Sequence, residues 1–264
     1  MINSVLSMLL RYVNSQYKKD ANYDIALCLL HHYDEIGNMT INEMADICYV
    51  SSASISRFIK LLGFQSFHEF KNACKNTLEI ANTDYSLEVS KAKKDDIEPI
   101  FARYTQHVID NIEYSYQQLN YEQIDRICHF IYESNQVIML GFEFSTLLAQ
   151  HIQSRFALMN KYVRIGFSYE EQLEAAKELN ENSTVLIATV EGGYFYRNDE
   201  IINVLNEKKA KIVVLTMNTQ SKLMKEVDEV IICGKENSDT ESRVSLLYVL
   251  ELLVMYYCIN FSHR

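Results

Sequence analysis

The chain of 264 residues is 48% hydrophobic and 23% charged, a composition typical of a globular protein long enough for two domains, which excludes disorder on a large scale. Its formal net charge of −10 argues at first sight against nucleic acid as a partner. The negative charge is unevenly distributed, however. Residues 1–80 hold 7 Lys and Arg against 8 Asp and Glu, whereas residues 81–264 hold 18 Lys and Arg against 27 Asp and Glu. DNA binding therefore stays open for the N-terminal part of the chain.

Helical periodicity dominates residues 1–80, and no strand pattern occurs there. The first segment lacks a basic leader and a cleavage signature, and Arg11 interrupts its apolar run after ten residues. We therefore expect a helix of the first domain at this end of the chain, and not a signal peptide.

Residues 39–71 have the internal spacing of a helix-turn-helix, with predicted helices at 41–48 and 52–62. Ser51 or Ser52 caps the second helix, and Gly63 closes it. The apolar residues fall on the faces that such a pair buries, at Met44, Ala45, Cys48, Val50, Ile55, Phe58, Ile59 and Leu62. The spacing thus predicts a second helix whose other face can contact DNA.

That other face carries short hydroxyls near the start of the helix and two cations further along. We expect the DNA-binding residues to be Ser51, Ser52, Ser54, Ser56, Arg57 and Lys60. Side chains near the start of such a helix reach base edges in the major groove, and cations contact phosphates. Residues 51–75 hold four cations against Glu69 alone, which adds a local positive charge. An ordinary helical hairpin with a polar outer face is the alternative.

The order A-x-x-x-x-V-S-x-x-S-I-S-R-F-x-K-x-L-G-F, from Ala45 to Phe64, resembles the N-terminal domain of the RpiR family of bacterial transcriptional regulators. That family continues with G-F-x-x-F-x-E-F-K, and residues 63–71 match it. Tyr49 departs from the pattern, because such motifs usually place Gly in the turn. If its φ is positive, Tyr49 costs about 1 kcal/mol and leaves the turn somewhat strained.

Residues 81–98 lose periodicity, gather charge and end at Pro99, the one proline of the chain. We expect them to be a linker between a DNA-binding domain at 1–80 and a second domain at 99–264. Two amphipathic helices are predicted at the start of the second domain, within residues 100–132.

Short β-branched runs then alternate with helical patterns. The predicted strands are 136–140, 162–165, 184–190, 211–216 and 229–233. This alternation predicts an α/β/α sandwich with a five-stranded parallel sheet, so the chain as a whole is α/β with an all-α N-terminal domain. Ligands bind such sheets at the carboxyl ends of the strands.

The loops after the first and third predicted strands, residues 141–145 and 189–194, look like those of a SIS (sugar isomerase) domain. In that family the loops read G-x-G-x-S and S-x-S-G-x-T and hold a sugar phosphate, and RpiR regulators carry the domain after their helix-turn-helix. Residues 221–223, 227–228 and 242–244 match it further. The resemblance implies effector contacts at Ser145, Thr189, Glu191, Gly192 and Tyr194.

Two carboxylates depart from this pattern. Glu143 replaces the second Gly of the first loop, and Glu191 replaces a phosphate-binding Ser. A carboxylate about 4 Å from a phosphate costs roughly 1 to 4 kcal/mol. We therefore hypothesise that the domain binds a neutral or cationic ligand such as an amino sugar, or binds nothing and serves as a dimerisation scaffold. Alternatively, Ser145 only caps its helix, and both glutamates face solvent.

The remaining patterns indicate neither a metal site nor a membrane span. The six cysteines form no C-x-x-C pair and are interpreted as buried thiols: Cys28, Cys48, Cys74, Cys128, Cys233 and Cys258. The seven histidines show no ligand spacing, and we expect no cofactor. The apolar run at 246–259 is too short for a membrane span and contains Glu251.

Together these patterns predict a cytoplasmic, non-enzymatic transcriptional regulator. Its expected partners are a double-stranded DNA operator, a sugar, amino-sugar or sugar-phosphate effector, and further copies of itself in a homodimer or homotetramer assembled through the last helix, 242–260. An aldose–ketose isomerase using Glu143 or Glu191 as its base is the alternative from another class. A protein-interaction module that has lost both ligands is the third.

Overall fold

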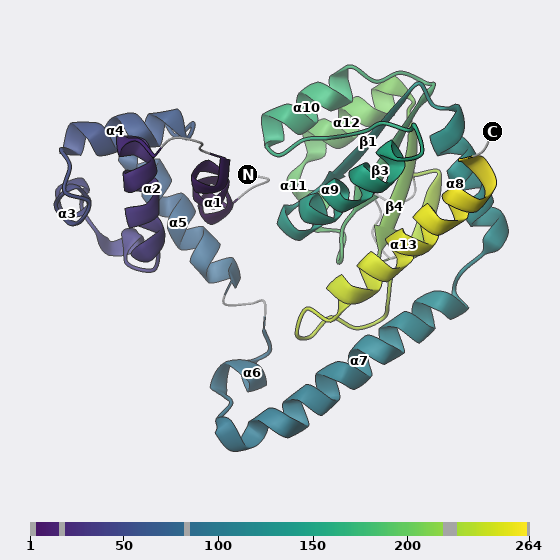
Figure 1. The fold of residues 1–264 in the computed structure, drawn as a ribbon, viewed down its shortest axis with the longest axis horizontal. Coiled ribbons are helices and arrows are strands. Elements are labelled where there is room, and N and C mark those ends of the chain that lie inside the picture. Colours follow the sequence, from purple (N-terminus) through teal and green to yellow (C-terminus); the bar gives the residue numbers. More distant parts are fainter. Residues whose placement is uncertain (1–3, 16–18, 82–84, 219–225, 263–264) are drawn as a thin grey trace. The chain divides into compact units, whose positions relative to one another are not determined.

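The computed structural model describes residues 4–15, 19–81, 85–218 and 226–262. The chain forms two compact units, residues 3–84 and residues 85–264, which we call the N-terminal and the C-terminal unit (Figure 1). Each is described by itself.

The N-terminal unit is helical, as predicted. Its elements are α1 (Val5–Ser15), α2 (Ala21–His31), η1 (Ile36–Asn38), α3 (Ile41–Ile47), α4 (Ser52–Leu61) and α5 (Phe67–Ala81). Apolar side chains from these elements form one core, in which Leu9, Ile25, Ile55, Phe58 and Phe70 are fully buried. The core holds the inner face of α4 and leaves its outer face exposed.

Capping side chains form hydrogen bonds with backbone amides at the starts of both helices of the helix-turn-helix. Thr40 and Glu43 form a capping box at the start of α3, and the Ser51 side chain accepts a hydrogen bond from the Ser54 amide at the start of α4. Tyr49 in the turn has a φ of 54°, and Gly63 after α4 has a φ of 97°. Both predicted helices are thus confirmed to within one residue, and the Tyr49 backbone lies in the left-handed region that non-glycine residues disfavour.

The interpretation of all six cysteines as buried thiols is wrong for three of them. Cys28 and Cys48 are joined by a disulfide, with their Cα atoms 5.7 Å apart. Cys258 is exposed, and the other three are free and buried. Periodicity places a cysteine on the apolar face of its own helix, but it does not show that the faces of two helices meet.

Much of the predicted linker is ordered and belongs to the C-terminal unit. Residues 85–117 include α6 (Leu87–Lys91), η2 (Lys94–Asp96) and α7 (Ile97–Gln117), and the Ser86 amide donates to Asp239 Oδ1 at 2.7 Å. Helix α7 begins before Pro99 because the first turn of a helix needs no backbone N–H, so proline is tolerated there.

The C-terminal unit is built on a parallel sheet of five strands in the order β2-β1-β3-β4-β5. The strands are β1 (Gln136–Gly141), β2 (Val163–Ile165), β3 (Ser183–Ala188), β4 (Lys211–Thr216) and β5 (Glu229–Ile232). Strands β1 and β3 are neighbours, and Gly141 pairs with Ala188 at their ends. The loops that follow these two strands therefore leave the same edge of the sheet side by side. The predicted α/β/α sandwich is confirmed.

Helices cover both faces of the sheet (Figure 1). One face packs against α8 (Tyr121–Glu133), α9 (Glu143–Ala157) and α13 (Ser242–Phe261), and the other against α10 (Tyr169–Lys177), α11 (Gly193–Arg197) and α12 (Asp199–Lys208). Side chains alternate along the strands, so Val137 and Met139 face the first layer while Ile138 and Leu140 face the second.

Helix α13 is, within the described part of the chain, the one helix long and apolar enough to cross a membrane. With 20 residues, α13 is longer than the apolar run 246–259, whose 14 residues were the reason to exclude a membrane span from the sequence. Leu246, Leu250, Leu253 and Tyr257 are nevertheless buried in the core against the sheet, as in a core helix of a globular unit.

Candidate functional site

The outer face of α4 displays the residues predicted to contact DNA. Arg57 and Lys60 are exposed, and Ser52, Ser54 and Ser56 are partly exposed. Arg57 Nη2 donates to Ser54 Oγ at 3.2 Å, and the hydroxyls of Ser51 and Ser54 lie 3.0 Å apart. The guanidinium is thus held along the helix, above the hydroxyls of the first turn.

Two residues at this face were not among the predicted contacts. Ser52 Oγ donates to Asn42 Oδ1 of α3 at 2.7 Å, so Asn42 fixes the orientation of one predicted base contact. Tyr49 is 96% exposed in the turn beside α4. The sequence pattern shows which face of α4 is polar, but it does not show which residues of α3 lie next to that face. For this reason it did not identify Asn42.

The electrostatics of this face favour an anionic partner. Among the described residues, no carboxylate pairs with Arg57 or Lys60, so both charges are available to phosphates. Lys71 is one of the four cations counted in residues 51–75. Its Nζ donates to the carbonyl oxygen of Met39 at 2.8 Å. Its role is at least partly structural.

The predicted effector residues lie in the loops after β1 and β3. Ser145 is nearly buried in the first turn of α9, where a side chain at Gly141 would collide with it. Gly192, the residue directly before α11, has a φ of 80°, which favours glycine. Thr189 Oγ1 accepts a hydrogen bond from the Tyr194 amide at 3.3 Å, so this hydroxyl helps close the loop.

Tyr194 does not offer its hydroxyl to a ligand at the loop surface. The side chain is fully buried, and its hydroxyl donates to Gln172 Oε1 at 2.7 Å. Burial raises the pKa of Tyr194, so the phenol stays neutral. The prediction relied on residue type in the motif, which does not show whether the side chain points out of the loop or into the core.

Loss of this hydroxyl is expected to destabilise the C-terminal unit. In Tyr194→Phe the buried amide oxygen of Gln172 loses its donor, which costs about 1–3 kcal/mol. Urea unfolding followed by circular dichroism measures the change, and Tyr162→Phe at an exposed position of the same unit is the matched control. Equal stability of the two variants would show that the bond contributes nothing.

Glu191 is exposed, but its carboxylate is bonded within the site. Asn237 Nδ2 donates to Glu191 Oε1 at 2.9 Å, and the Ser242 hydroxyl donates to Asn237 Oδ1. This chain links the loop after β3 to the start of α13. Glu143, the first residue of α9, is exposed and has a φ of 30°.

Two arginines flank the same loops. Arg197 lies over the ring of Phe142 at 5.7 Å, and Arg243 lies over the ring of Phe144 at 5.6 Å. These aromatic contacts were not predicted. Residues 221–223, which match the SIS pattern in the sequence, lie outside the described residues. Within the described part of the chain, no group of three or more His, Cys, Asp or Glu is placed to hold a metal ion.

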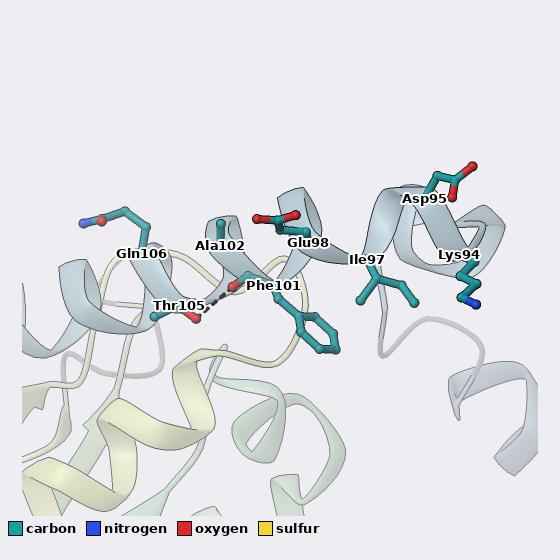
Figure 2. A pocket seen from close by; sticks show the side chains of 8 residues that line it. All are labelled: Lys94, Asp95, Ile97, Glu98, Phe101, Ala102, Thr105 and Gln106. Carbon is teal, nitrogen blue, oxygen red and sulfur yellow. Dashed lines mark hydrogen bonds between the residues drawn. The ribbon is translucent and has the colours of Figure 1, made fainter.

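An open hollow lies along α7, and none of the predicted site residues lines it. One continuous segment, residues 94–106, supplies its lining. Figure 2 shows Ile97 and Phe101 pointing to the same side of this segment, and Phe101 is 67% exposed. It is an apolar strip of helix surface without convergent polar groups, so it does not resemble a small-molecule site.

Two family models match the chain. A helix-turn-helix domain of the rpiR family matches residues 7–80, and a SIS domain matches residues 130–256. The first includes α3 and α4, and the second includes the loops after β1 and β3. The matches thus cover both candidate sites.

Relatives match over most of their length. An HTH-type transcriptional regulator of Providencia stuartii is 26% identical over 236 residues, which are 89% of this chain and 83% of that protein. The HTH-type transcriptional regulator RpiR of Escherichia coli K12 is 22% identical over 226 residues, 81% and 72% of the two chains. The structure of Vibrio vulnificus NanR complexed with ManNAc-6P matches with a TM-score of 0.54 at 14% identity, covering 97% of this chain and 93% of that one. At such identity the likeness shows the fold.

Proposed function

The chain belongs to the rpiR family of HTH-type transcriptional regulators and carries a SIS domain, and from this we propose that it binds operator DNA through α4 in the cytoplasm and regulates genes of sugar or amino-sugar metabolism. We propose the N-terminal unit as the DNA-binding domain, and the C-terminal unit, which includes residues 85–98 of the predicted linker, as the effector and assembly domain. The naming of the relatives as regulators supports a role without catalysis.

The outer face of α4 is the observation that carries this proposal. It combines partly exposed hydroxyls near the helix start with two exposed cations that no described carboxylate neutralises. We assign the serines to base edges and the cations to phosphates. Titration of a labelled DNA duplex with the full chain at rising salt tests it: we expect binding that weakens steeply with salt, and no binding at about 50 mM salt would contradict it.

A regulator of this kind needs two recognition helices for two half-sites, so we propose that copies pair through α9 and α13. These helices lie side by side, and His151 of α9 contacts Glu251 of α13. Large apolar side chains are exposed on both, including Leu147 of α9 at 59% and Ile259 of α13 at 69%. The exposed apolar surface of α13 is smaller than the composition of this helix suggests, because most of its apolar residues are buried in the core.

A charge placed on this surface is expected to break the assembly. Met255 is exposed on α13, and Met255→Glu puts a carboxylate into the proposed interface, where it would be desolvated without a partner. Sedimentation of the variant should show monomers at concentrations where the unaltered chain is oligomeric. Phe101→Glu in the α7 hollow is the matched control, and dissociation of that variant alone would move the interface to α7.

We propose further that the SIS-like site has lost its affinity for sugar phosphates and takes a neutral or cationic sugar, or serves only as a scaffold. Glu191 is held toward Asn237 and the start of α13 from the loop where a phosphate-binding Ser is expected. Arg197 and Arg243 are nearby, but each lies over an aromatic ring. The fixed carboxylate therefore disfavours the binding of a phosphate about 4 Å away by roughly 1 to 4 kcal/mol.

Calorimetry with an amino sugar, its neutral counterpart and its 6-phosphate tests this reading. The unaltered chain should not bind the phosphate, while Glu191→Gln removes the repulsion and should gain affinity for it roughly tenfold or more. Glu181→Gln, at an exposed carboxylate outside these loops, is the control for net charge. Tight binding of the sugar phosphate by the unaltered chain would contradict the proposal.

A further inference from the structure

The disulfide between Cys28 and Cys48 connects two parts of the N-terminal unit that are far apart in sequence. Cys28 lies in the last turn of α2, and Cys48 ends α3, 20 residues later. Their Cα atoms are 5.7 Å apart, within the usual span of a disulfide. The bond therefore needs no movement of the backbone of either helix.

The pair is also more accessible to small reagents than the three buried cysteines. Both cysteines are only partly buried, so a small reagent can reach them. By contrast, burial raises the pKa of the Cys74 and Cys128 thiols to about 12, and that of Cys233 also rises, which suppresses the thiolate form. Cys258 is exposed but has no free described cysteine beside it at the surface. Formation of a disulfide within the chain by a small-molecule disulfide should thus be selective for the pair, whereas exchange at Cys258 ends at a mixed disulfide.

The pair lies directly before the turn of the helix-turn-helix. Cys48 precedes Tyr49, whose positive φ of 54° disfavours this turn, and α4 begins at Ser52. In the disulfide-bonded structure the turn is closed by the hydrogen bond from the Val50 amide to the Ala45 carbonyl oxygen at 3.0 Å, and the Ser51 side chain caps the start of α4. The bond to α2 therefore fixes the backbone at the point where the turn is least favourable.

A regulator that binds DNA works in a compartment that keeps thiols reduced, where disulfides are usually transient and redox-sensing. We propose that Cys28 and Cys48 form a thiol–disulfide modification site, closed by small-molecule disulfides, that raises the DNA affinity of α4 when it is oxidised. The effect on DNA rests on the proposed function. The oxidised form binds more tightly because the turn is ordered before DNA arrives.

The chemistry is two successive thiol–disulfide exchanges with one low-molecular-weight disulfide such as oxidised glutathione. One cysteine thiolate attacks a sulfur of the reagent and releases one thiol, and the second cysteine then attacks the mixed disulfide and releases the other. One S–S bond forms in the protein and one is reduced in the reagent. The protons of Cys28 and Cys48 end on the two released thiols.

The full chain is equilibrated over a range of reduced and oxidised glutathione, free thiols are alkylated, and the blocked positions are mapped by mass spectrometry. Melting of the N-terminal unit and affinity for a DNA duplex are measured on the same samples. Cys28 and Cys48 should become protected by a bond to each other, whereas protection of Cys258 carries the mass of a glutathione adduct. The melting temperature should rise by roughly 5 °C or more, and DNA affinity should be higher on the order of tenfold. Cys258→Ser should behave like the unaltered chain.

Cys28→Ala and Cys48→Ala, prepared separately so that one folding failure does not decide the outcome, should each lose the redox dependence. Alkylation of both positions at every glutathione ratio would overturn the site. Protection of the pair without a change in melting or DNA affinity would overturn its regulatory effect. If neither redox state binds DNA, the proposed function fails, and the thiol map and melting temperature still decide whether the site exists.

Discussion

Alanine at position 57 is expected to lower the affinity for operator DNA roughly 10- to 100-fold, because a charge-assisted hydrogen bond contributes about 1.5–3 kcal/mol. Arg57 is exposed on α4, and its one described hydrogen bond is to Ser54 within the same helix, so the folded unit does not depend on it. If the guanidinium contacts a phosphate, binding should weaken equally for all sequences, and the slope of log affinity against log salt should fall by about 1.

Fluorescence anisotropy with labelled duplexes at several salt concentrations measures both quantities. Lys19→Ala removes one exposed cation from the same unit, before the start of α2, and serves as the control for net charge. An equal loss in both variants would show that the total charge of the unit, and not the α4 face, determines DNA affinity.

Phe58→Ala is expected to unfold most of the N-terminal unit. Phe58 is fully buried on the inner face of α4, and its ring lies edge-on to Tyr12 of α1 with centroids 5.3 Å apart. Removing such a ring costs about 3–5 kcal/mol, which is comparable with the total stability of a domain of this size. DNA binding should disappear with the helical signal of this unit.

Phe156→Ala makes the same change in the C-terminal unit, where Phe156 is equally buried and lies edge-on to Tyr257. In a thermal unfolding experiment with two transitions, each variant should lower the midpoint temperature of its own unit only. A single shared transition that moves equally in both variants would contradict the independence of the two units.

The parts of the fold that follow from local periodicity could be predicted from the sequence. Helices α3 and α4 end within one residue of their predicted bounds, because caps and apolar spacing are properties of a few neighbouring residues. The start of α7 was placed too late, since a proline was taken as a boundary although it lies in the first turn.

Features that depend on contacts between distant elements could not be predicted. The disulfide of Cys28 and Cys48 depends on how α2 packs against the end of α3. The bond from Asn237 to Glu191, 46 residues apart, depends on the loop after β3 meeting the start of α13. The direction of the Tyr194 side chain, into the core, is likewise set by its tertiary partner Gln172. Such contacts leave no pattern along the chain.

Capture of genomic fragments by the purified full chain at about 150 mM salt, with Arg57→Ala in parallel, tests the central proposal most directly. Recognition by paired α4 helices predicts enrichment of a palindromic site with half-sites about one turn of DNA, or a multiple of it, apart, and no enrichment by the variant. Equal enrichment by both proteins, or a captured site without two-fold symmetry, would contradict recognition by paired α4 helices.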